Sequence, residues 1–102
     1  MILRPQKHYF TYWQWIYRAL DSVNHPLHER FQDLNDEKVL VSLDELDLIM
    51  EAVKEYRDEF VLALEVEVED GTEEAEDCEG NMEILDEIIN FLNACRAPYA
   101  HP

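Results

Sequence analysis

The sequence predicts a small all-α protein, in which a single helical domain of residues 1–102 carries a long acidic antiparallel helical hairpin. Three observations support this fold class. Apolar residues recur at helical spacing through several long segments. A Ser-x-x-Glu sequence and an Asp-Gly-Thr sequence are typical of helix starts and turns. Finally, 47% of the residues are apolar, which is enough to build a core in a chain of 102 residues.

The first predicted helix is the aromatic segment HYFTYWQWIYRALD, residues 8–21. One apolar stripe at helical spacing consists of Tyr9, Trp13, Ile16, Tyr17 and Leu20. Other aromatic side chains lie outside this stripe, so the helix must be covered on nearly all sides. Pro26 disfavours helix at the residue before it and ends the segment. A short second helix is expected over residues 27–34, with Leu27, Phe31 and Leu34 facing inward.

A long helix is predicted to start at the capping box formed by Ser42 and Glu45. Its apolar face consists of Leu43, Leu46, Ile49, Met50, Val53, Tyr56, Phe60 and Leu64. The stretch VLALEVEVE, residues 61–69, is ambiguous, because its strict alternation is also typical of a strand. An isolated two-stranded pair is only marginally stable, so we favour helix. The alternative is an α+β fold in which residues 38–41 and 61–68 form a short two-stranded pair.

The turn of the hairpin is predicted at Asp70-Gly71-Thr72. Gly71 can adopt the left-handed conformation at the C′ position of the preceding helix, and Thr72 can cap the next helix. Glu73 and Glu74 then occupy the first turn, where the helix dipole favours acidic residues. Beyond the turn a heptad seam consists of Ala75, Cys78, Met82, Leu85, Ile89 and Leu92. Towards the C-terminal end this seam is widened by Ile84, Ile88, Phe91 and Cys95.

The chain is strongly acidic, with 24 acidic and 8 basic residues and a formal charge of −16, and no base occurs between Arg57 and Arg96. In the densest segment, EVEVEDGTEEAEDCEG, the nine carboxylates are those of Glu65, Glu67, Glu69, Asp70, Glu73, Glu74, Glu76, Asp77 and Glu79. Opposite charges four residues apart stabilise a helix, whereas like charges destabilise it. Glu69, Glu73 and Asp77 are expected to stack at this spacing without a compensating base. The acidity therefore needs a reason other than helix stability.

We expect this acidic surface to bind a basic partner. Carboxylates held along a helix can imitate the phosphates of a nucleic acid and occupy the groove of a basic nucleic-acid-binding protein or nuclease. This predicts an acidic inhibitor, a DNA mimic, as in phage counter-defence (anti-CRISPR or anti-restriction) or toxin immunity. The same charge disfavours direct binding to nucleic acid or to an anionic membrane. The simpler alternative is a solvated helix face that only keeps the protein in solution.

The aromatic first helix supports a hypothesis of a different class. Its candidate interface residues are Phe10, Tyr12, Trp13, Trp15 and Tyr17. Core packing explains part of this set, but the surplus is hard to bury in a small chain, and interfaces favour Trp and Tyr. The alternative function is therefore an interaction or scaffold module that works through this helix, as a homodimer or with a second protein.

Catalytic and metal-binding functions have little support in the sequence, and we expect no enzyme, no cofactor and no metal site. The Glu-x-x-Asp spacing of magnesium-dependent nucleotide pyrophosphohydrolases occurs at Glu55 and Glu83, but it arises easily by chance in so acidic a chain. A calcium-loop spacing lacks the required Asp, Asn and Gly residues, and its glutamates are Glu65, Glu67, Glu69, Glu73 and Glu76.

The remaining signals concern the compartment. The two cysteines, Cys78 and Cys95, do not form a disulfide framework and are expected to be reduced core residues. No stretch approaches the roughly 18 apolar residues of a membrane span. The sequence therefore predicts a cytoplasmic protein.

Overall fold

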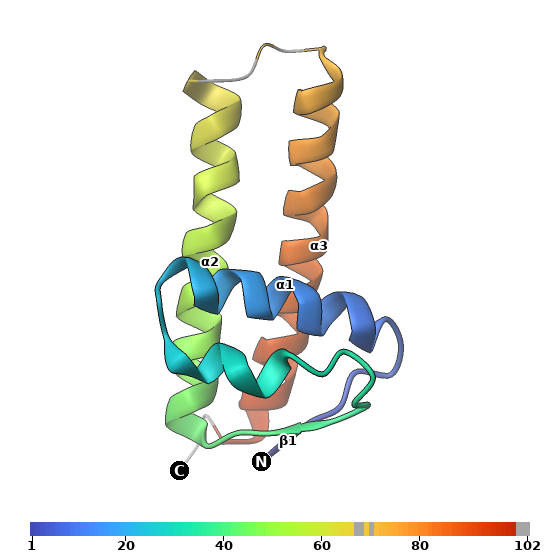
Figure 1. The fold of residues 1–102 in the computed structure, drawn as a ribbon, viewed down its shortest axis with the longest axis vertical. Helices are drawn as coiled ribbons and strands as arrows, with labels where there is room; N and C mark the ends of the chain where they lie inside the picture. The colour runs from blue at the N-terminus through green and yellow to red at the C-terminus, as the bar shows by residue number, and fades with distance from the viewer. Residues whose placement is uncertain (67–68, 70, 100–102) are drawn as a thin grey trace.

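The structure is a computed structural model that describes residues 1–66, 69 and 71–99. Its elements, in order, are β1 (Ile2–Leu3), α1 (Tyr9–Ser22), the 3-10 helix η1 (Pro26–Phe31), β2 (Val39–Leu40), α2 (Leu43–Val66), α3 (Glu73–Arg96) and the 3-10 helix η2 (Ala97–Tyr99). The helices α2 and α3 run antiparallel side by side, and α1 crosses one half of this pair (Figure 1). The predicted helical domain with a long antiparallel hairpin is confirmed.

The helix α1 is aromatic on several sides because it packs against three other elements. Tyr12 contacts Phe91 of α3, with ring centroids 5.4 Å apart. Trp15 contacts Phe60 of α2 at 6.1 Å. On another side of α1, the Trp13 ring lies 5.4 Å from Phe31 of η1. The indole N–H of Trp13 donates a hydrogen bond to the Asp36 carbonyl oxygen, so the buried ring keeps a polar partner.

The segment after Pro26 is helical, but it is shorter and tighter than predicted. It forms the 3-10 helix η1, which ends at Phe31 instead of continuing as a helix to residue 34. Leu27 and Phe31 are buried as expected, whereas Leu34 is half-buried. The ring Nδ1 of His25 accepts a hydrogen bond from the Leu27 N–H at 3.1 Å and so caps this helix.

The capping box at the start of α2 is confirmed in both directions. The Ser42 hydroxyl accepts from the Glu45 N–H at 3.1 Å, and the Glu45 carboxylate accepts from the Ser42 N–H at 2.8 Å. Arg30 binds the same carboxylate at 2.7 Å. The hydrogen bond from the Ser42 N–H has the largest effect on the pKa of the Glu45 carboxyl, and the bond from Arg30 has the next largest. Both hold this pKa below its usual value.

Residues 61–66 belong to α2, as we favoured, whereas residues 67 and 68 of the ambiguous stretch lie outside the described residues. A short antiparallel pair does exist, in which β2 pairs with β1, whereas residues 61–66 are helical. Ile2 lies opposite Leu40, and Leu3 lies opposite Val39. The strand that the alternative placed at residues 38–41 is thus present, but its partner is β1, because the N-terminal segment folds back beside β2.

The predicted turn is confirmed at Thr72 and partly at Gly71. The Thr72 hydroxyl accepts from the Ala75 N–H at 3.2 Å and donates to the Glu69 carbonyl oxygen at 2.8 Å. Gly71 has the expected positive φ of 81°. Because Glu69 is already outside the helix, however, Gly71 lies in the linker between α2 and α3 and not at the C′ position of α2.

The buried face of α3 differs from the predicted heptad seam. Leu85, Ile88 and Leu92 are fully buried, whereas Ile89 of the seam is only partly buried. A seam that faces only α2 does not describe the buried face of α3, because α1 packs as a third layer on the same half of the hairpin (Figure 1). In the other half Ala75 is buried, but Leu62 and Val66 are 59% and 73% exposed. We call this half, residues 61–66 and 73–83, the protruding end of the hairpin.

Candidate functional site

The protruding end carries a dense set of exposed carboxylates. Seven acidic side chains are exposed there, and they are Glu65, Glu73, Glu74, Glu76, Asp77, Glu79 and Glu83. No Lys or Arg lies in this part of the chain. Glu69 is also exposed in the linker, whereas Glu67 and Asp70 of the predicted acidic surface lie outside the described residues.

Along α3 the carboxylates follow the helical repeat. Glu76, Glu79 and Glu83 are three and four residues apart and therefore share one face. Glu73 and Asp77 stack at a spacing of four, as predicted. The expected stack of Glu69 on Glu73 is wrong, because Glu69 precedes the Thr72 cap and does not belong to α3.

The ion pairs lie outside the protruding end. Arg96 of α3 contacts Asp47 of α2 at 2.5 Å, and this contact lowers the pKa of the Asp47 carboxyl. Arg57 of α2 contacts Asp86 of α3, also at 2.5 Å. Both pairs join the two long helices in the half that also packs against α1. The negative charge beyond them has no compensating base within the described chain.

The charge density of the protruding end is similar to that of a nucleic acid. In α3, six carboxylates fall between residues 73 and 83. Ten helical steps of 1.5 Å span about 15 Å, which gives about one charge per 2.5 Å. B-DNA carries about one charge per 3.4 Å along one strand and about one per 1.7 Å along the duplex. The number of charges per unit length of this part of α3 thus lies between these two values.

The candidate aromatic interface is largely part of the core. Trp13 is fully buried, and Tyr12 and Trp15 are each only 7% exposed. Tyr17 is half-buried and stacks on His28 with ring centroids 5.2 Å apart. Of these five candidates, Phe10, at 51% exposure, is the one that presents an exposed ring. The surplus that suggested an interface is absorbed within the chain, and the homodimer stays an untested prediction.

The described part of the chain gives no candidate metal site. Among the described residues, no three His, Cys, Asp or Glu side chains are grouped so that they could hold a metal ion. Asp86, from the second Glu-x-x-Asp pair, faces Arg57 instead. No helix in the described part of the chain is both long and apolar enough to cross a membrane.

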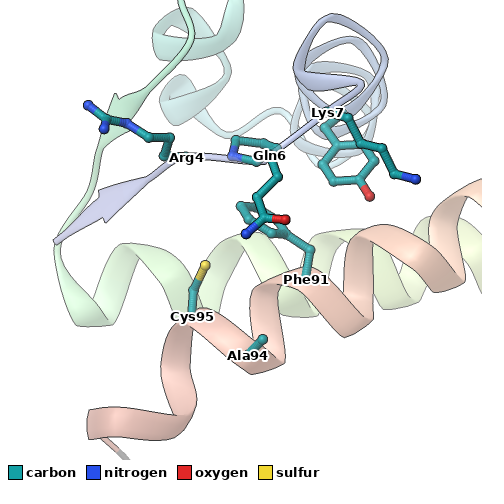
Figure 2. Close-up of a pocket in the computed structure, with 8 residues that line it drawn as sticks. Arg4, Gln6, Lys7, Phe91, Ala94 and Cys95 are labelled. Atoms are coloured by element: carbon teal, nitrogen blue, oxygen red, sulfur yellow. The ribbon is translucent and has the colours of Figure 1, made fainter.

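One feature of the surface was not predicted from the sequence. A hollow with a volume of about 370 Å³ lies between the segment after β1 and the last turns of α3 (Figure 2). Arg4, Gln6 and Lys7 line one side, and Phe91 and Cys95 line the other. Burial raises the pKa of the Cys95 thiol, so it stays protonated at neutral pH. Arg4 and Lys7, which stand on either side of Pro5 and Gln6, were the only sequence signal for this hollow.

In comparisons with known proteins, no family model matches the chain, and neither a curated protein nor a solved structure gives a match.

Proposed function

We propose that this protein is an acidic inhibitor that binds a basic nucleic-acid-binding protein or nuclease through the protruding end of its hairpin, in place of nucleic acid. The observation that supports the proposal is the set of seven exposed carboxylates, without any base, on two helices that extend beyond α1. Phage counter-defence against CRISPR or restriction enzymes, and toxin immunity, are the settings in which such an inhibitor would act.

The placement of the bases favours a binding role over a solvated face. Bases spaced four residues from acids would stabilise the exposed helices, yet the chain has none in the protruding end. Three of its eight bases form ion pairs elsewhere, at Arg30, Arg57 and Arg96. Like charges left together on a thin helix pair lower its stability. Attraction to a basic groove is a physical reason for keeping them together.

The helical frame also favours binding. Because the carboxylates are attached to two long helices, their relative positions are fixed before a partner arrives, and less ordering is needed on binding. The summed field of the charges should accelerate encounter with a basic surface and repel nucleic acid itself.

The test compares two variants with the same net charge. The first replaces four carboxylates of the protruding end by amides, at Glu73, Glu76, Asp77 and Glu79. The control makes the same replacement at four exposed acids outside the protruding end, which are Glu29, Glu37, Glu51 and Glu55. Displacement of a labelled oligonucleotide is measured against purified basic nucleases, including a CRISPR effector and a restriction enzyme.

We expect the wild-type protein to displace the oligonucleotide from its target and the control variant to do so almost equally. The first variant should compete less well, mainly through slower association, and rising salt should weaken competition because exposed charges are screened beyond about 8 Å. Equal affinity of the first variant and the wild-type protein at low salt would contradict the proposal. In that case the carboxylates would only form a solvated face.

A further inference from the structure

We propose that the hollow shown in Figure 2 binds a small organic anion that carries a flat apolar group, such as an aromatic carboxylate or a mononucleotide. This site lies at the opposite end of α3 from most of the acidic surface, near its last turns. The inference therefore does not depend on the inhibitor function.

The hollow combines an apolar floor with polar groups at its rim. The Phe91 ring forms part of the floor and packs on Tyr12 at 5.4 Å, so its position is fixed by the core. In Figure 2 the Gln6 amide extends towards this ring, and the Cys95 sulfur points into the same space. The guanidinium of Arg4 and the ammonium of Lys7 lie on opposite sides. A flat ring can stack on Phe91 while its acidic group reaches a base at the rim.

The charges around the hollow indicate an anionic ligand. The chain has three acids for each base, so a base can easily find a partner. Even so, neither Arg4 nor Lys7 has a carboxylate within 4 Å among the described residues. Two bases at opposite edges of an apolar hollow thus remain available, and a ligand's acidic group can replace the missing partner of either one.

Among the described residues, two carboxylates lie beside residues that line the hollow. Glu37 borders an adjoining hollow that Arg4 also lines. Glu87 lies beside the Tyr12 hydroxyl, whose pKa is raised first by burial and then by this carboxylate. Together with the overall charge of −16, these groups favour a ligand with one or two charges over a nucleic acid chain. A volume of about 370 Å³ is also within the size range of small-molecule pockets, roughly 300 to 1,000 Å³.

The experiment is a two-dimensional NMR titration of the whole chain at low ionic strength with three separate probes. Benzoate tests a carboxylate source, adenosine monophosphate tests a nucleotide source, and inorganic phosphate tests the charge without the ring. We expect benzoate or the nucleotide to shift the amide signals of residues 4–7 and 91–95, and phosphate to shift them less. Absence of these shifts with both ring-bearing probes would overturn the proposal.

Variants test the assigned roles, and all of the changed side chains are exposed. Lys7→Gln and Arg4→Gln should each weaken binding by about two- to fivefold, the range of an exposed ion pair. Glu87→Gln should strengthen binding, and the control Lys38→Gln should leave it unchanged. A double Arg4→Gln, Lys7→Gln variant that binds the probe as tightly as the wild-type protein would contradict the proposal.

An independent readout uses the thiol in the hollow. In a Cys78→Ser background only Cys95 can react with iodoacetamide. A bound ring should slow this alkylation at saturating probe by several fold. An unchanged alkylation rate at a probe concentration that saturates the NMR shifts would show that the probe binds elsewhere and would overturn the assignment.

Discussion

Replacing Gly80 by alanine tests whether α3 is one continuous helix through the protruding end. Gly80 lies within α3 (Glu73–Arg96), and a methyl group added there meets no heavy atom within 4 Å. Glycine inside a helix is less favourable than alanine by about 0.8–1 kcal/mol. We therefore expect Gly80→Ala to raise the free energy of unfolding by about this amount. At about 2.1 cal/mol/K of unfolding entropy per residue, the Tm should rise by about 4–5 °C.

The matched control is the other glycine of the chain. A methyl group added at Gly71 would also have free space around it, but the φ of 81° is strained for any residue with a side chain. Gly71→Ala should therefore lower stability by about 1 kcal/mol, the lower end of the cost of a left-handed conformation. Thermal unfolding followed by far-UV circular dichroism compares both variants with the wild-type protein. A Tm that Gly80→Ala leaves unchanged or lowers would refute a continuous helix at Gly80.

Other substitutions test the core and the helix start. Ser42→Ala should lower the free energy of unfolding, measured with urea, by about 1 kcal/mol, because it removes the hydroxyl that caps α2. The pKa of the Glu45 carboxyl is lower in the folded than in the unfolded state. The ionised carboxylate therefore contributes to stability above about pH 4.3, and this contribution is lost as the pH falls through the folded pKa. Glu45→Gln should therefore lower the Tm at neutral pH and converge with the wild-type protein in acid. Trp13→Phe should lower the free energy of unfolding by about 2–3 kcal/mol in the same urea experiment. The smaller ring leaves a gap beside Phe31, and the Asp36 carbonyl oxygen loses its hydrogen-bond donor.

Features set by neighbouring residues were predicted correctly from the sequence. The capping box at Ser42 and the Thr72 cap depend on groups three residues apart, and both form as expected. The alternation in residues 61–66 did not produce a strand, because the helical stripe through Phe60 and Leu64 could pack against the rest of the hairpin.

Features that depend on distant parts of the chain were not predictable in the same way. The partner of β2 is the N-terminal strand β1, almost 40 residues earlier, and nothing near Val39 indicates this pairing. The burial of Trp13 and Trp15 depends on the direction in which α1 crosses the hairpin, which no periodicity within α1 specifies. The hollow beside Phe91 likewise exists only because residues 4–7 fold back onto α3.

The division of the hairpin into two halves explains how the chain tolerates its charge. In the half next to α1, aromatic rings from α1 and α2 pack together, and Arg57 and Arg96 join the two long helices. These contacts hold α2 and α3 side by side. They therefore also align the two helices in the protruding end, which needs only a thin core. Self-repulsion there acts on two helices that are already anchored at one end. Changes of charge in the protruding end should therefore have little effect on the fold. Loss of packing around Trp15, in contrast, should disturb the alignment of α2 and α3, on which the acidic surface depends.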